Sequence, residues 1–110
     1  MIYWANEEID LPVQDDDVVQ WWGQTKNLKN LVNRPNEVIL SNYDETYLDV
    51  GFGSRNGGNY LTYIKWRDIY KFEPKFTGVN IIGGEVCMWG ELSNQRTNEQ
   101  KIWNRASILA

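Results

Sequence analysis

Short apolar segments rich in β-branched and aromatic residues alternate with amphipathic segments along this chain. The composition of the apolar segments is typical of buried strands and predicts strands at Met1–Trp4, Val18–Trp22, Glu37–Asn42 and Val79–Trp89. Apolar residues at helical spacing predict helices at Thr25–Val32, Thr62–Phe72 and Asn98–Ala110. Because buried strands that alternate with helices form parallel sheets with helices outside, the sequence predicts an α/β fold.

Composition and charge exclude several classes of function. The chain has 110 residues, enough for one small domain at most, and its net charge of −4 with scattered Lys and Arg argues against a nucleic-acid-binding surface. No apolar run is long enough to span a bilayer, and no signal-peptide pattern follows Met1. The chain has no histidine and one cysteine, which excludes histidine metal ligands, a cysteine zinc site, an internal disulfide and a Ser-His or Cys-His nucleophile pair. We therefore expect no metal and no cofactor.

Six tryptophans are the most informative excess in the composition. In parallel α/β folds, ligands bind at the carboxyl ends of the strands. Every predicted strand ends in an aromatic residue or is followed by one, and Asp49 and Glu91 add carboxylates after the last two strands. Aromatic walls with carboxylates that accept hydroxyl hydrogen bonds predict a site for a neutral sugar. Trp66 and Trp103 lie on predicted helices, where we expect them to pack in the core or between a helix and the sheet.

Three segments of the chain together resemble one enzyme family. The segments are VILSNYDETYLDVGFG, WRDIYKFEP, and IIGGEVCMWGELS followed by IWNRAS. They resemble the C-terminal part of the catalytic barrel of glycoside hydrolase family 20, the β-N-acetylhexosaminidases, and most of all its arthropod members. The resemblance implies a (β/α)8 TIM barrel, of which the chain holds roughly strands five to eight with their helices. Residues 1–110 are then expected to be a C-terminal portion of the catalytic domain, truncated at both ends, because a complete barrel needs about 250 residues.

The resemblance also implies an activity and a set of site residues. Members hydrolyse terminal non-reducing N-acetylhexosamine residues by a substrate-assisted retaining mechanism, in which the acetamido oxygen of the sugar attacks its own anomeric carbon. By position, Tyr47 matches the tyrosine that orients the acetamido group. Trp89 matches the platform under the sugar ring, and Trp4 and Trp22 match walls around the acetamido methyl. Asp49 and Glu91 match carboxylates that hold outer hydroxyls of the sugar. The substrate-binding residues implied in this way are Trp4, Trp22, Asp49, Trp89 and Glu91.

The chain departs from the family pattern at the catalytic acid. The Asp-Glu pair of the family follows a His-x-Gly-Gly pattern upstream of this region, and Asp44-Glu45 matches a non-catalytic stretch, so the chain alone is expected to be inactive. Arg55 stands near the position of a tryptophan that chitin-degrading arthropod members carry. This departure favours a broader hexosaminidase that acts on terminal GlcNAc or GalNAc.

Two other interpretations stay open beside the enzyme. The chain could be a non-catalytic carbohydrate-binding α/β module that uses its tryptophan surface, or a tryptophan-rich structural piece without a ligand. For the enzyme, the resemblance implies an oligosaccharide or glycan with N-acetylhexosamine as the partner, and a secreted or lysosomal parent protein. It leaves open whether that parent is a dimer.

Overall fold

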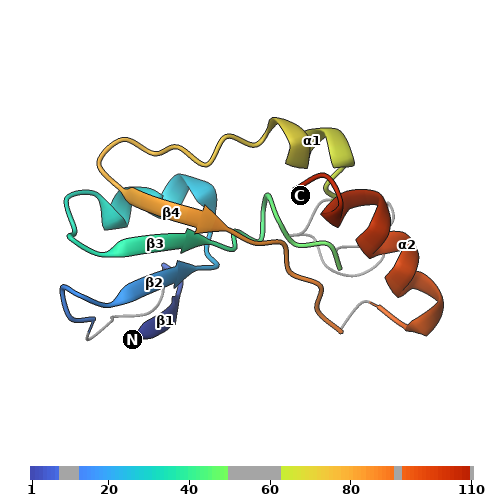
Figure 1. Cartoon of the computed structure of the whole chain (residues 1–110), viewed down its shortest axis with the longest axis horizontal. Coiled ribbons are helices and arrows are strands. Elements are labelled where there is room, and N and C mark those ends of the chain that lie inside the picture. The colour runs from blue at the N-terminus through green and yellow to red at the C-terminus, as the bar shows by residue number, and fades with distance from the viewer. Residues whose placement is uncertain (8–12, 50–62, 91–92, 110) are drawn as a thin grey trace. The chain divides into compact units, whose positions relative to one another are not determined.

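The computed structural model describes residues 1–7, 13–49, 63–90 and 93–109 of the chain (Figure 1). These residues belong to two units, which we describe separately. The first unit comprises Met1–Tyr43 and Glu73–Glu85, and the second comprises Asp44–Phe72 and Val86–Ala110. Within the described ranges, no helix combines the length and the apolar character needed to cross a bilayer.

A four-stranded parallel sheet forms the first unit, with its strands side by side in chain order (Figure 1). Its strands are β1 (Ile2–Ala5), β2 (Val18–Trp21), β3 (Glu37–Leu40) and β4 (Asn80–Gly84). All three neighbouring pairs are parallel. The parallel sheet confirms the predicted α/β fold class.

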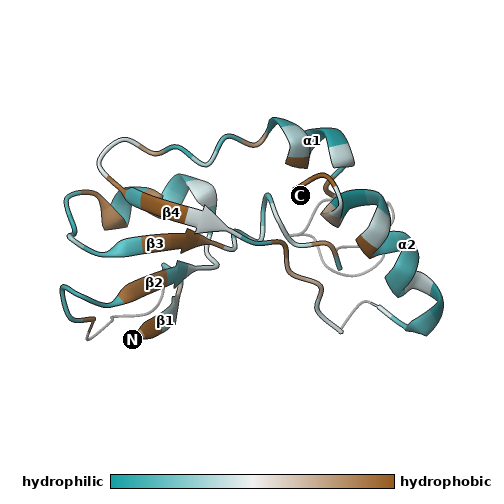
Figure 2. Ribbon diagram, viewed as in Figure 1, coloured by the Kyte–Doolittle hydropathy of each residue, from teal (hydrophilic) through white to brown (hydrophobic). Residues whose placement is uncertain are grey.

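The core of the first unit comes from the middle strands and one helix. Val19 and Trp21 of β2 and Val38 and Leu40 of β3 are buried, and Figure 2 shows apolar residues in the middle of these strands. The helix predicted after β2 is present as a 3-10 helix, η1 (Thr25–Leu31), and it contributes its own buried leucines. Burial of each such side chain contributes about 1.5–3 kcal/mol.

Strand β4 ends earlier than predicted. The apolar pattern predicts a strand up to Trp89, but β4 ends at Gly84, and its pairing with β3 shifts register between Val38 and Ile39. A β-bulge of this kind bends a strand, and the glycines that follow it have no side chains to pack. The strand therefore stops, and the residues from Val86 onward belong to the second unit.

A polar cluster connects the carboxyl ends of three strands. Gln20 of β2 donates through Nε2 to Ser41 Oγ, 3.0 Å away, and also to the Glu85 carboxylate. Ser41 Oγ donates to Glu85 Oε1 at 2.9 Å. Because Ser41 follows β3 and Glu85 follows β4, these hydrogen bonds hold β2, β3 and β4 together at one edge of the sheet.

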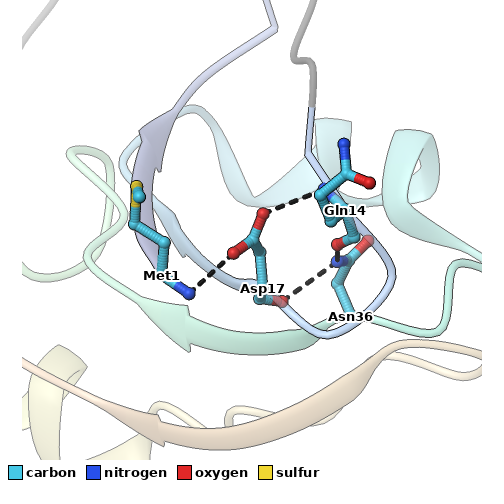
Figure 3. A network of polar contacts seen from close by, with 4 residues as sticks. All are labelled: Met1, Gln14, Asp17 and Asn36. Atoms are coloured by element: carbon cyan, nitrogen blue, oxygen red, sulfur yellow. Dashed lines mark hydrogen bonds and ion pairs between the residues drawn. The ribbon is translucent and has the colours of Figure 1, made fainter.

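A second polar network lies at the amino ends of the strands (Figure 3). The Asp17 carboxylate accepts from the Met1 ammonium at 2.6 Å and from the Gln14 backbone N–H at 2.9 Å. These two hydrogen bonds hold the pKa of Asp17 below its usual value. Asn36 Nδ2 donates to the carbonyls of Gln14 and Asp17, at 2.7 and 3.0 Å. The network therefore joins the residues that precede β1, β2 and β3.

Among its described residues, the second unit has two helices, α1 (Trp66–Lys71) and α2 (Gln95–Ala106). Helix α2 begins earlier than the predicted start at Asn98, because Asn94 caps it: its Oδ1 accepts from the backbone N–H groups of Arg96 and Thr97, at 3.0 and 3.2 Å. The apolar cluster of this unit is built from side chains of several segments: Leu48, Ile64, Ile69, Val86, Met88 and Ala106.

The prediction that the helical tryptophans pack in the core is wrong within the second unit, and their packing against the sheet stays a prediction. Trp66 on α1 is 48% exposed and Trp103 on α2 is 68% exposed. The residues that α2 buries are Lys101 and Arg105, which occupy the inner face where apolar side chains were expected. Their long aliphatic stems can cover apolar surface as a hydrophobic side chain does.

Candidate functional site

Tyr47 and Trp89 lie against each other in the second unit. Tyr47 forms a parallel bridge with Cys87, in which Cys87 N–H donates to Thr46 O at 3.1 Å and Leu48 N–H donates to Cys87 O at 2.7 Å. Side chains two residues apart in an extended segment point to the same face. The side chain of Trp89 therefore lies on the same face as those of Cys87 and its bridge partner Tyr47. The two ring centroids are 5.8 Å apart, with the planes tilted by 51°.

This aromatic pair combines a buried phenol with an accessible indole. Tyr47 is buried, whereas Trp89 is 38% exposed and presents a flat apolar surface. An indole plane of this kind can pack against the apolar face of a pyranose ring, and a phenol hydroxyl beside it can donate a hydrogen bond. The structure thus brings together two of the residues that the sequence assigned to one site.

Asp49 is also buried in the second unit. It stands two residues after Tyr47, and its backbone carbonyl accepts a hydrogen bond from Lys101 Nζ at 2.6 Å. Burial lowers the pKa of Lys101 and of Arg105, and the negative charge of Asp49 acts against that lowering in both. The Asp49 carboxylate therefore lies within the electrostatic field of two buried cations.

The other predicted site residues lie in the first unit or outside the described residues. Glu91 and Arg55 lie outside the described residues. Trp4 and Trp22 belong to the first unit, where Trp4 is partly exposed, Trp22 is half-buried and Trp21 is buried. Strand β2 ends at Trp21, so Trp22 lies just after it. That Trp4 and Trp22 share a site with Tyr47 stays a prediction.

Sequence reasoning missed Lys101 and Arg105 as groups that contact the site segment. The helix is predicted from the spacing of its apolar residues alone, whereas the residues that it buries are these two cations, one turn apart on one face. In the described part of the chain, no three His, Cys, Asp or Glu side chains gather in a way that could hold a metal ion.

Glu45 supplies a prediction on pH dependence. Burial raises the pKa of Glu45, and the Asp44 and Asp68 carboxylates raise it further. The folded protein therefore binds this proton more tightly than the unfolded chain, so stability falls as pH rises through the raised pKa. Glu45→Gln is expected to increase the Tm at neutral pH and to reduce this loss, measured by thermal unfolding across pH.

The matched control for Glu45→Gln is Glu99→Gln, which neutralises an exposed carboxylate on α2. The control is expected to keep the wild-type change in Tm between acid and neutral pH. If Glu45→Gln showed the same pH profile as the control, burial of Glu45 would not be the source of the effect.

Comparison with known proteins gives one consistent family. A sequence model described as glycosyl hydrolase family 20, catalytic domain, matches residues 1–110. The chain is 33% identical over 106 residues to the chitooligosaccharidolytic beta-N-acetylglucosaminidase of Ostrinia furnacalis, covering 88% of this chain and 18% of that protein. It is 36% identical over 104 residues to the probable beta-hexosaminidase fdl of Drosophila melanogaster, covering 84% and 16%.

A mammalian relative shows a similar match. The chain is 32% identical over 109 residues to the beta-hexosaminidase subunit alpha of Mus musculus, covering 89% of this chain and 19% of that protein. The chain thus spans less than a fifth of the length of these three relatives.

Proposed function

Because the chain belongs to glycosyl hydrolase family 20, we propose that it is the sugar-binding part of a β-N-acetylhexosaminidase that removes terminal non-reducing GlcNAc or GalNAc residues. The catalytic domains of this family are TIM barrels, and we place the chain at roughly strands five to eight. The observation that carries the proposal is the Tyr47–Trp89 pair, in which the ring of a buried tyrosine lies 5.8 Å from the ring of a partly exposed tryptophan.

In the proposed reaction, the sugar supplies its own nucleophile. The acetamido carbonyl oxygen attacks the anomeric carbon, the glycosidic bond breaks, and the leaving oxygen takes a proton from a general acid. Water then attacks the anomeric carbon of the oxazolinium ion, the bond to the acetamido oxygen breaks, and the proton of the water returns to the same group, with retention. Tyr47 donates a hydrogen bond to the acetamido carbonyl oxygen and aligns it for attack. Trp89 supports the ring, and Asp49 and Glu91 accept hydrogen bonds from outer hydroxyls.

We further propose that the general acid comes from outside these 110 residues. The chain contains no histidine and hence no counterpart of the His-x-Gly-Gly-Asp-Glu pattern. Asp44-Glu45 is assigned no catalytic role. Trp4 and Trp22 are proposed as walls around the acetamido methyl, and the parent enzyme is proposed to be secreted or lysosomal.

The proposal is tested by hydrolysis of nitrophenyl glycosides by the full-length parent protein. Turnover is expected with the β-linked N-acetylglucosaminide or N-acetylgalactosaminide and not with the matched β-glucoside, because the glucoside has no acetamido oxygen that could attack its anomeric carbon. The 110-residue chain alone is expected to give no turnover.

Two outcomes would contradict parts of this proposal. Turnover by the 110-residue chain would show that its acid lies within the chain. Saturable quenching of tryptophan fluorescence by GlcNAc, without hydrolysis by the full-length protein, would favour the carbohydrate-binding module instead, because the accessible Trp89 suits that function as well.

A further inference from the structure

Helix α2 buries two cationic side chains. Lys101 is 2% exposed and Arg105 is 1% exposed, and they stand one helical turn apart on the same face. Removing two charges from water is costly unless strong hydrogen bonds replace their hydration. The acceptors of these cations therefore indicate what the pair does in the structure.

Two of the acceptors are backbone carbonyls of the segment that follows Tyr47. Lys101 Nζ donates to Asp49 O at 2.6 Å and to Ser93 Oγ at 3.2 Å. Arg105 donates through Nη2 to Leu48 O, the carbonyl one residue earlier. Consecutive carbonyls of one segment are thus both bound by cations of one helix, in charge-assisted hydrogen bonds, which are about twice as strong as neutral ones.

Further contacts fix the guanidinium of Arg105. Its Nη1 donates to Ile64 O at 3.1 Å, and its Nε donates to Lys101 O at 3.0 Å. Its central carbon lies 4.7 Å from the centroid of the Tyr63 ring, within range of a cation–π interaction. A planar group held on several sides gives the Leu48 carbonyl a fixed hydrogen-bond donor.

The segment Tyr47–Asp49 is therefore held from two directions. The bridge to Cys87 uses the Leu48 N–H, and the α2 cations use the carbonyls of Leu48 and Asp49. Fixed peptide planes set the direction in which the Tyr47 and Asp49 side chains leave the backbone. Stability alone does not require buried charges, because well-packed apolar residues in their place are often as stable or more stable.

We propose that Lys101 and Arg105 are positioning residues, which fix the backbone of Tyr47–Asp49 so that both side chains meet the sugar in a productive orientation. This inference rests on the proposed function of Tyr47 and Asp49. It adds to that function two residues that act through the backbone and do not themselves contact the sugar.

The test uses Lys101→Met in the full-length enzyme, which keeps the aliphatic stem and removes the ammonium. The kcat/KM for the nitrophenyl N-acetylglucosaminide is expected to fall about 10- to 100-fold, because a misplacement of about 1 Å can cost about 10²-fold. The control is Arg96→Met, which removes an exposed cation from the same helix and is expected to keep the wild-type kcat/KM. Circular dichroism and Tm establish the folded fraction of each variant.

A double-mutant cycle separates positioning from a structural role. If Lys101 acts through Asp49, Lys101→Met is expected to lose most of its effect on kcat/KM in an Asp49→Asn background. Multiplicative effects of the two substitutions, or wild-type kcat/KM in folded Lys101→Met, would overturn the inference while leaving the proposed function standing.

Two further variants keep the test decisive. If Lys101→Met does not fold, Lys101→Arg takes its place; it keeps the charge with a different donor geometry and is expected to show a reduced kcat/KM, and a wild-type value would overturn the inference. Arg105→Lys is expected to lower kcat/KM in the same way, since lysine cannot reproduce the fork of donors. A wild-type enzyme that leaves N-acetylhexosaminides intact would overturn the proposed function first, and the inference with it.

Discussion

Tyr47→Phe is expected to lower the kcat of the full-length enzyme by about 10²-fold, because the acetamido oxygen loses the hydrogen bond that aligns it for attack and a misplacement of about 1 Å can cost that much. The phenylalanine ring keeps the contact with Trp89 at a centroid distance of 5.8 Å, so the sugar platform stays intact. KM is expected to change much less than kcat, because the lost hydrogen bond aligns the acetamido oxygen for attack and contributes mainly to the chemical step. Steady-state kinetics with the nitrophenyl N-acetylglucosaminide measure both constants.

The control for Tyr47→Phe is Tyr70→Phe, which removes the hydroxyl of an exposed tyrosine on α1. This variant is expected to have wild-type kcat and KM. A Tyr47→Phe enzyme with wild-type kcat would contradict the assigned role of Tyr47, and it would favour the interpretation of the chain as a structural piece without a ligand.

Trp21→Ala is expected to lower the free energy of unfolding by about 3–5 kcal/mol, the usual cost of truncating a buried tryptophan. Trp21 is buried in the sheet of the first unit, and its Nε1 donates to Gln24 O at 3.3 Å. Because domains are stable by only about 5–15 kcal/mol, this loss is a large share of the total. Urea unfolding followed by circular dichroism measures it.

Trp103→Ala is the matched control for Trp21→Ala, since it truncates a tryptophan that is 68% exposed. Its effect is expected to stay within about 0.5 kcal/mol. If the two variants lost equal stability, the burial that distinguishes Trp21 from Trp103 would not determine their contributions.

The sequence predicts the sheet better than it predicts the helices. Strands buried on both faces have continuous apolar runs, so β2 and β3 are found where their runs lie. The end of β4 is missed because the apolar run continues through residues that belong to the second unit. The start of α2 is missed because the cap at Asn94 lies before the first apolar residue of the pattern.

The site is predicted in part. Tyr47 follows the predicted strand Glu37–Asn42 and Trp89 ends the predicted strand Val79–Trp89, and the family resemblance assigned both to the site whose pair the structure brings together. The burial of Lys101 and Arg105 cannot be predicted from the pattern of polar residues. Their cationic groups donate to backbone carbonyls, and every residue type has a backbone carbonyl. Only the folded backbone shows that such acceptors lie within reach of the helix.

The path of the chain has a consequence for synthesis. The chain passes between the two units three times, after Tyr43, after Phe72 and after Glu85. During translation, β1 to β3 emerge from the ribosome before β4, and residues of the second unit emerge between β3 and β4. Until β4 arrives, the open edge of β3 is exposed to pairing with other nascent chains. Slow translation between β3 and β4 would prolong the exposure of this edge, and a chaperone bound to β3 would cover it.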